Sequence, residues 1–255
     1  MQPFTLALGA GILIGAAWPW IVAGGSVLAI PVLMALIGLK HPRAAEGTSL
    51  VAMTAIACIG VIMSAWQHTV RWVQTMEFTI PALAGLELER VLGYGLPLRV
   101  RLVVLGCLLL LTVSLMVSLP ESRQSWMSRD QKRQASLVPK GFVVGILAGW
   151  IGLGGGLLVM PTLLFSGLPL MVATGSAFVP MASLGMANAF PYAITSAIHW
   201  KVLAIFLSGA IMGIGASLAV IRKIGHPQPL IRMMMAGLAV ISVIIIGANV
   251  HGLYT

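Results

Sequence analysis

Long apolar blocks fill most of this 255-residue sequence and leave little room for a polar surface. Hydrophobic residues make up 59% of the chain, charged residues only 8%, and the mean hydropathy is +1.02. An ordinary soluble domain carries about 25% charged residues, so this composition excludes a soluble enzyme as well as a disordered chain. A β-barrel would alternate apolar and polar residues instead. The blocks predict an all-α polytopic membrane protein and lie near residues 4–39, 48–68, 72–95, 100–119, 138–167, 171–198, 202–221 and 229–250.

One polar stretch, Pro120–Lys140, divides the chain nearly in half. It carries an excess of Lys and Arg over Asp and Glu, which is typical of a short cytoplasmic loop. The net charge of +9 is therefore assigned to such loops and not to nucleic-acid binding. We expect a first transmembrane repeat over 1–119, a cytoplasmic basic linker over 120–140 and a second transmembrane repeat over 141–255.

The two halves resemble each other when the first is shifted by 130 residues. Two glycines, a tryptophan, a glycine-rich triplet and a proline then coincide in one ungapped register, and after a two-residue slip the match continues into the next block. Internal duplication is the architecture of many secondary transporters. The matched positions include Gly11 with Gly141, Gly15 with Gly145, Trp20 with Trp150, Pro31 with Pro161, and further on His68 with His199.

The long first and fifth blocks leave two topologies open. If each is a glycine-broken, re-entrant hairpin, each half has about three full spans and the halves are inverted. If each block crosses fully, each half has four spans and the halves are parallel. Placing the basic residues Arg71, Arg222, Lys223 and Arg232 on the cytoplasmic side with the linker favours the inverted arrangement.

The sharpest motif is the triplet Gly154-Gly155-Gly156, whose counterpart in the first half is Gly24-Gly25-Ser26. Glycines in the middle of a membrane helix favour a break. The helix that resumes after the break presents unpaired N–H groups and a partial positive charge, which attract anions. For the outer glycines Gly141, Gly145 and Gly149 we expect close helix packing instead.

Small polar residues at the start of the next block form a second group of candidate substrate-binding residues. Thr48 and Ser49 in the first half correspond to Thr174 and Ser176 in the second. Their hydroxyls either cap free N–H groups or bind substrate oxygens. Asn188 adds an amide, which needs a partner when it is buried.

His68, His199 and Lys201 lie at block ends and are candidates for gating or proton coupling, or for anchoring at the headgroup region. Lys201 is the basic residue that we expect to reach inward. We find no catalytic constellation and no metal motif, and we expect no cofactor. Cys58 and Cys107 lie in apolar blocks and do not indicate a disulfide framework.

The stretch Gly141–Ala177, GFVVGILAGWIGLGGGLLVMPTLLFSGLPLMVATGSA, resembles the signature of the TauE/SafE sulfite exporter family, and the first half carries a diverged copy. The resemblance implies a multi-pass permease of the cell inner membrane for a small anion such as sulfite or an organosulfonate. Its implied partners are that anion and the lipid bilayer. Protons are the expected coupling ion, and monomer and homodimer both stay open. A membrane-embedded enzyme, an anion channel and a non-transporting scaffold are the alternatives.

Overall fold

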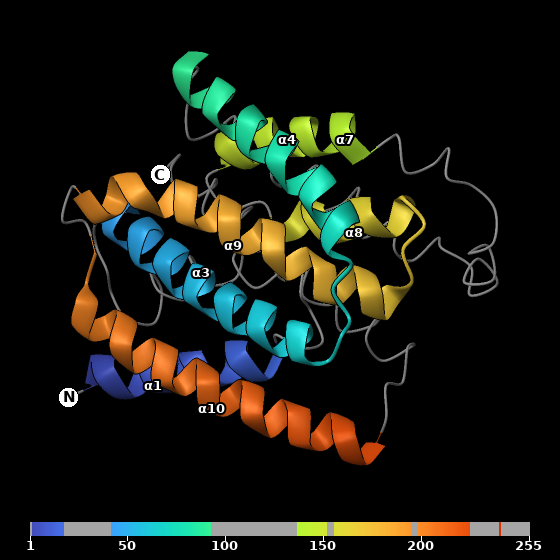
Figure 1. Cartoon of the computed structure of the whole chain (residues 1–255). Coiled ribbons are helices and arrows are strands. Elements are labelled where there is room, and N and C mark those ends of the chain that lie inside the picture. Colours follow the sequence, from blue (N-terminus) through green and yellow to red (C-terminus); the bar gives the residue numbers. More distant parts are fainter. Residues whose placement is uncertain are drawn as a thin grey trace.

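The structure is a computed structural model that describes residues 2–17, 42–92, 137–151, 156–194, 198–224 and 240. Within these ranges all the regular structure is α-helical, as the apolar blocks predicted. Figure 1 labels the seven described helices. Their bounds are α1 Gln2–Ala17, α3 Pro42–Trp66, α4 Trp72–Leu92, α7 Leu137–Ile151, α8 Gly156–Phe165, α9 Leu170–Ile194 and α10 Trp200–Ile224.

Two of these helices contain segments long and apolar enough to cross a membrane, judged by length and composition. The segments are Gly47–Trp66 in α3 and Met171–Ile194 in α9, with mean hydropathies of 2.0 and 1.2. Each reaches the roughly 20 residues that a bilayer core requires. Shorter apolar helical segments lie at Thr5–Ala16, Leu137–Trp150 and Trp200–Ala216.

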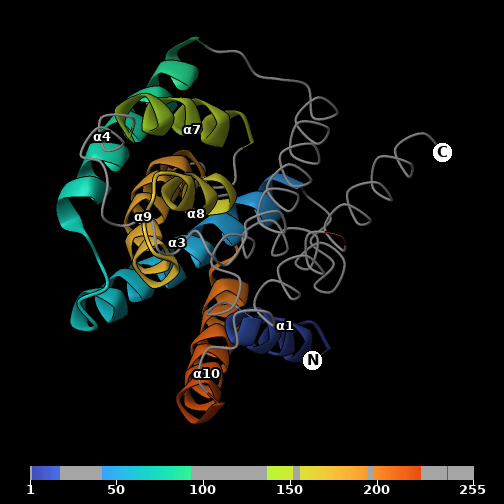
Figure 2. The ribbon, with the colours of Figure 1, turned by 90° about the vertical axis from the view of Figure 1, so that its right-hand side faces the viewer.

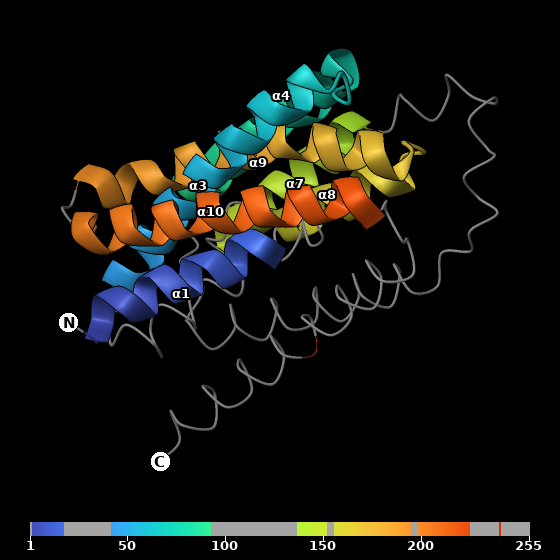
Figure 3. The ribbon, with the colours of Figure 1, turned by 90° about the horizontal axis from the view of Figure 1, so that it is seen from below.

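The helices α3 and α9 form the middle of three layers and run antiparallel (Figures 1 and 3). Ile56 of α3 and Leu184 of α9 are fully buried in the core. Two glycines bring the helices close together: a Cβ at Gly60 would overlap the ring of Phe178, and a Cβ at Gly185 would meet the Thr54 hydroxyl. The pair therefore forms the packed centre of the molecule.

On either side of this centre lies a pair of helices, one from before residue 93 and one from after residue 136 (Figure 2). The two helices of each pair run in the same direction (Figure 1). In one pair α1 packs against α10, and in the other α7 packs against α4. Glycines set both contacts, because a Cβ at Gly15 would overlap the Ala210 carbonyl and a Cβ at Gly145 would overlap the Ala82 carbonyl. Gly141 meets the Phe78 carbonyl in the same way. The close packing expected for Gly141 and Gly145 is confirmed.

The helices α7 and α8 form a hairpin. Lys140 in the first turn of α7 donates from Nζ to the hydroxyl of Ser166, just past the end of α8, at 3.2 Å. With 15 and 10 residues, the helices are about 22 Å and 15 Å long. Neither can cross a hydrocarbon core of about 30 Å by itself. Because Lys140 contacts Ser166, the start of α7 and the end of α8 lie at the same end of the described fold.

The apolar block near residues 72–95 is helical over Trp72–Leu92 as α4, despite Pro81 in its interior. Thr75 and Thr79, both buried, donate to the carbonyls four residues earlier, so their hydroxyls need no other partner. The triplet Gly24-Gly25-Ser26 and the blocks expected at 100–119 and 229–250 lie outside the described residues, apart from residue 240. The expected division into two repeats and a linker stays a prediction.

Candidate functional site

The start of α8 lies near the middle of the central helix pair. Gly156 is the first residue of α8 and is buried, and a Cβ there would meet Met181 Cε of α9 at 2.6 Å. Met181 is three residues from Leu184, about 4–5 Å along the helix axis. The α8 N-terminus, whose first N–H groups have no partner within the helix and which carries a partial positive charge, therefore lies beside the middle of α9. Gly154 and Gly155 lie outside the described residues.

Asn188 is a polar residue of α9 on the same face as Met181. It follows Met181 by seven residues, which places it two turns further along the same face. The side-chain nitrogen of Asn188 is buried, and it has no hydrogen-bond partner. Because a buried amide without a partner is costly, this nitrogen is a donor that a bound acceptor would satisfy.

The hydroxyls of Thr48 and Ser176 make two matching hydrogen bonds. Thr48 Oγ1 accepts from the backbone N–H of His199 at 3.2 Å, and Ser176 Oγ accepts from the backbone N–H of Arg71 at 3.1 Å. Both side chains are fully buried. Each donor directly precedes a helix, α10 or α4, so each hydroxyl caps a helix of another part of the chain.

These hydroxyls do not begin their own helices, which corrects the expected helix starts. Pro42 begins α3, and the Pro169 carbonyl accepts from Ala173 in the first turn of α9. Proline is favoured in the first turn because its missing N–H costs nothing there. Thr48 and Ser176 therefore lie in the second turns.

The predicted polar residues are distributed over two ends of the α3–α9 pair. Thr48 and the almost fully buried Ser49 lie at one end. Ser176, which is fully buried, and Thr174, which is half-buried, lie at the other. Ser64 marks the Ser176 end of α3, because the chain turns there and Arg71 then binds Ser176. Thr48 and Ser64 are separated by about 24 Å along the axis of α3. The structure places Gly156 beside Met181, two turns of α9 from Asn188, and it does not bring the two hydroxyl groups together.

The two histidines also lie at opposite ends. His68 is exposed in the turn after α3, with a positive φ of 54°. His199 is exposed beside the start of α3, and Lys201 is exposed in the first turn of α10. The histidines therefore do not form one cluster, and the contact expected of Lys201 with the interior is not seen.

The basic residue that does reach α9 is Arg90, which the sequence analysis missed. It lies in the last turn of α4 and donates through Nη2 to the carbonyl oxygen of Ala187 at 2.8 Å, the residue before Asn188. Its Nη1 pairs with Glu87 at 2.6 Å. No spacing rule links positions 97 residues apart, so pattern reasoning could not find this contact.

Among the described residues no three His, Cys, Asp or Glu side chains gather in a group able to hold a metal ion.

The described residues form a helical bundle with two helices long and apolar enough to cross a membrane, and the relatives described next bear the names of membrane proteins. The family model of the sulfite exporter TauE/SafE matches residues 6–246, so the chain belongs to the TauE/SafE family. Two curated relatives, each called "Probable membrane transporter protein", come from Xylella fastidiosa strains 9a5c and Temecula1. Both are 28% identical, over 250 and 252 residues, and the alignments cover 96% of this chain and 95% of each relative. No solved structure matches the chain.

Proposed function

We propose that the chain is a secondary transporter that moves a small anion across the inner membrane, with sulfite and organosulfonates as the first substrates to test. The carrying observation is the start of α8 near mid-depth, two turns along one face of α9 from the unpartnered Asn188 amide. An anion in this region gains hydrogen bonds from the unpartnered Asn188 amide and from N–H groups that have no partner within their own helix. The family name and the relatives' names support transport of this kind.

The proposal includes a chain built of two inverted repeats. A shift of 128 residues carries α3 onto α9 and the start of α4 onto the start of α10. The same shift carries the Thr48 bond to His199 onto the Ser176 bond to Arg71, with the halves exchanged. Antiparallel α3 and α9 and the hairpin formed by α7 and α8 favour inversion over parallel repeats.

The distribution of basic residues supports an orientation for these repeats. Arg71 and Lys140 lie at the end of the molecule where α9 begins. α10 starts beside Thr48 at the opposite end and is 25 residues long, so Arg222 and Lys223 return to the Arg71 end. We assign that end to the cytoplasm, since short loops rich in Lys and Arg stay inside.

The experiment is uptake of radiolabelled sulfite and sulfoacetate into proteoliposomes by wild type, Gly156→Leu and Gly9→Leu. Leucine at Gly156 occupies the space beside Met181, whereas a Cβ at Gly9 meets nothing within 4 Å. We expect uptake by Gly156→Leu to fall at least about tenfold, equivalent to 1.4 kcal/mol, while Gly9→Leu transports normally.

Three outcomes would contradict this function. Full uptake by Gly156→Leu removes the α8 start from the pathway. Flux without counterflow, at rates no carrier reaches, indicates an anion channel. Chemical conversion of a substrate by purified protein in detergent, with no compartments present, indicates a membrane-embedded enzyme.

A further inference from the structure

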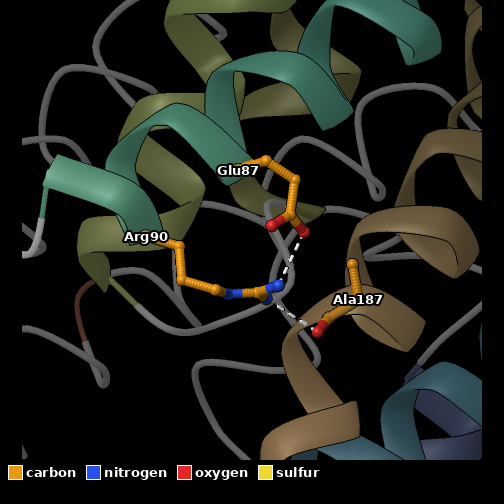
Figure 4. A network of polar contacts seen from close by, with 3 residues as sticks. All are labelled: Glu87, Arg90 and Ala187. Carbon is orange, nitrogen blue, oxygen red and sulfur yellow. Dashed lines mark hydrogen bonds and ion pairs between the residues drawn. The ribbon is translucent and has the colours of Figure 1, made fainter.

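The hydrogen bond from Arg90 of α4 to the Ala187 carbonyl of α9 depends on a proline that lies four residues after Ala187. In a regular helix the carbonyl of Ala187 would accept the N–H of residue 191. That residue is Pro191, which has no N–H. The Ala187 carbonyl is therefore left without its helical donor, and Nη2 of Arg90 takes that place (Figure 4).

The guanidinium of Arg90 keeps donors to spare. It presents five N–H groups in a planar fork, and the structure commits one nitrogen to Glu87 and another to Ala187. The side chains of Arg90 and Glu87 are 37% and 53% exposed. An ion pair this exposed contributes little to stability, so another anion can replace the Glu87 carboxylate at small cost.

The same turn of α9 holds the second unused donor. Asn188 directly follows Ala187, and its buried nitrogen has no partner. Gly149 of α7 also lies on this side of α4, because a Cβ there would meet Leu86 and Glu89. The acceptor of the guanidinium and the unpartnered amide therefore lie in the same turn of α9, beside the last turn of α4.

We infer that Arg90 is the cation of the proposed anion site and that Glu87 is its resident counter-ion, displaced when an oxyanion binds. This inference rests on the proposed function. The ligand class is a small oxyanion with at least two oxygens able to accept the guanidinium fork, such as sulfite or a sulfonate. Without substrate, Arg90 is paired with Glu87. When the anion binds, it takes the place of the Glu87 carboxylate on the guanidinium.

A purely structural ion pair makes a different prediction from a displaceable counter-ion. If Arg90 only ties α4 to α9, removing either charge weakens the fold, and neither change improves anion binding. If Glu87 competes with the substrate, removing its charge strengthens anion binding while removing Arg90 weakens it. The two variants therefore act in opposite directions only under the inference drawn here.

The test is isothermal titration of full-length protein in detergent with sulfite and with sulfoacetate. We expect the Kd to rise at least about tenfold in Arg90→Gln. It should rise less in Arg90→Lys, because lysine keeps the positive charge but lacks the planar fork. In Glu87→Gln we expect the Kd to fall several-fold. Glu77→Gln is the matched control: it makes the same change at an exposed position of α4 ten residues earlier and is expected to leave Kd within about twofold.

The outcomes separate this inference from the function on which it rests. Wild type that binds neither anion overturns both. Wild type that binds while Arg90→Gln binds equally well, or Glu87→Gln that weakens binding, overturns only the role of Arg90. If Arg90→Gln does not fold, as judged by size-exclusion chromatography, tighter binding by Glu87→Gln with weaker binding by Arg90→Lys still supports the inference, and the absence of either change refutes it.

Discussion

The two halves of the molecule share a scaffold but differ in the polar groups that they carry. With the 128-residue shift, α3 and α9 have equal length and make equivalent hydrogen bonds. The glycine contacts of α1 with α10 likewise match those of α7 with α4. The chemistry does not follow the same symmetry. Asn188 falls where the first half has Gly60, and Pro191 falls where it has Met63.

The helices packed outside this pair differ in the same way. Glu87 and Arg90 of α4 correspond to Gly215 and Leu218 of α10. Among the described residues, the side chains of Glu87, Arg90 and Asn188 thus lie on the α4–α9 side, and the equivalent positions of α10 and α3 hold Gly215, Leu218 and Gly60. The comparison teaches that the proposed duplication conserves how the helices approach one another, while the donors for a ligand are concentrated at one of two equivalent places.

The largest expected effect tests whether the scaffolds are equivalent. Gly15→Ala and Gly145→Ala each place a methyl group against a backbone carbonyl, of Ala210 and Ala82 respectively. We expect both to destabilise the protein by about 2–3 kcal/mol, in equal measure, in thermal unfolding in detergent. Gly9→Ala, where the space is open, should be neutral or stabilising because alanine favours the helix. Strong destabilisation by only one of the two variants would break the symmetry.

A second prediction tests whether the polar groups are specialised. Asn188→Leu removes a buried amide that lacks a partner, so we expect the protein to be about 1 kcal/mol more stable and sulfite uptake to fall about tenfold. Gln74→Leu is the matched control, because Gln74 Oε1 of α4 is also buried without a partner. It should gain similar stability and keep its transport. Equal transport loss in both variants would show that Asn188 has no special role.

The smallest expected effect concerns the two reciprocal hydrogen bonds. Thr48→Val and Ser176→Ala each remove one acceptor and leave the backbone N–H of His199 or Arg71 without its partner. We expect each to cost about 0.5–1.5 kcal/mol, with the two costs agreeing and adding in the double variant, since the sites lie far apart. Melting temperatures of the four proteins measure this, and a cost confined to one site would show that the two bonds are not equivalent.

The sequence predicted the helical class, the family and the close packing of Gly141 and Gly145, because each of these depends on local composition or on a compact motif. It did not predict which helices those glycines contact. The described apolar helices are hydrophobic on nearly all sides, so no polar stripe indicates the face that meets a partner. That α1 packs against α10, and α7 against α4, could therefore be learned only from the structure.

The role of Thr48 and Ser176 illustrates the same limit. Hydroxyls at these positions predicted capping or substrate binding, and the sequence could not show that they would cap helices from elsewhere in the chain. Arg90 was missed because its acceptor is a backbone carbonyl freed by Pro191, and neither residue has a recognisable pattern. Gly156 and Asn188 remain proposed ligand contacts, while the triplet Gly24-Gly25-Ser26 lies outside the described residues.

The packing of α1 against α10 has a consequence for biosynthesis. The surface that Gly11 and Gly15 present is complementary to α10, which the ribosome completes about 200 residues later. During that interval α1 must wait in the bilayer with its small-residue face against lipid or another protein. A nascent chain released before residue 200 would therefore lack the partner of its first helix, so the contact between α1 and α10 can form only late in translation.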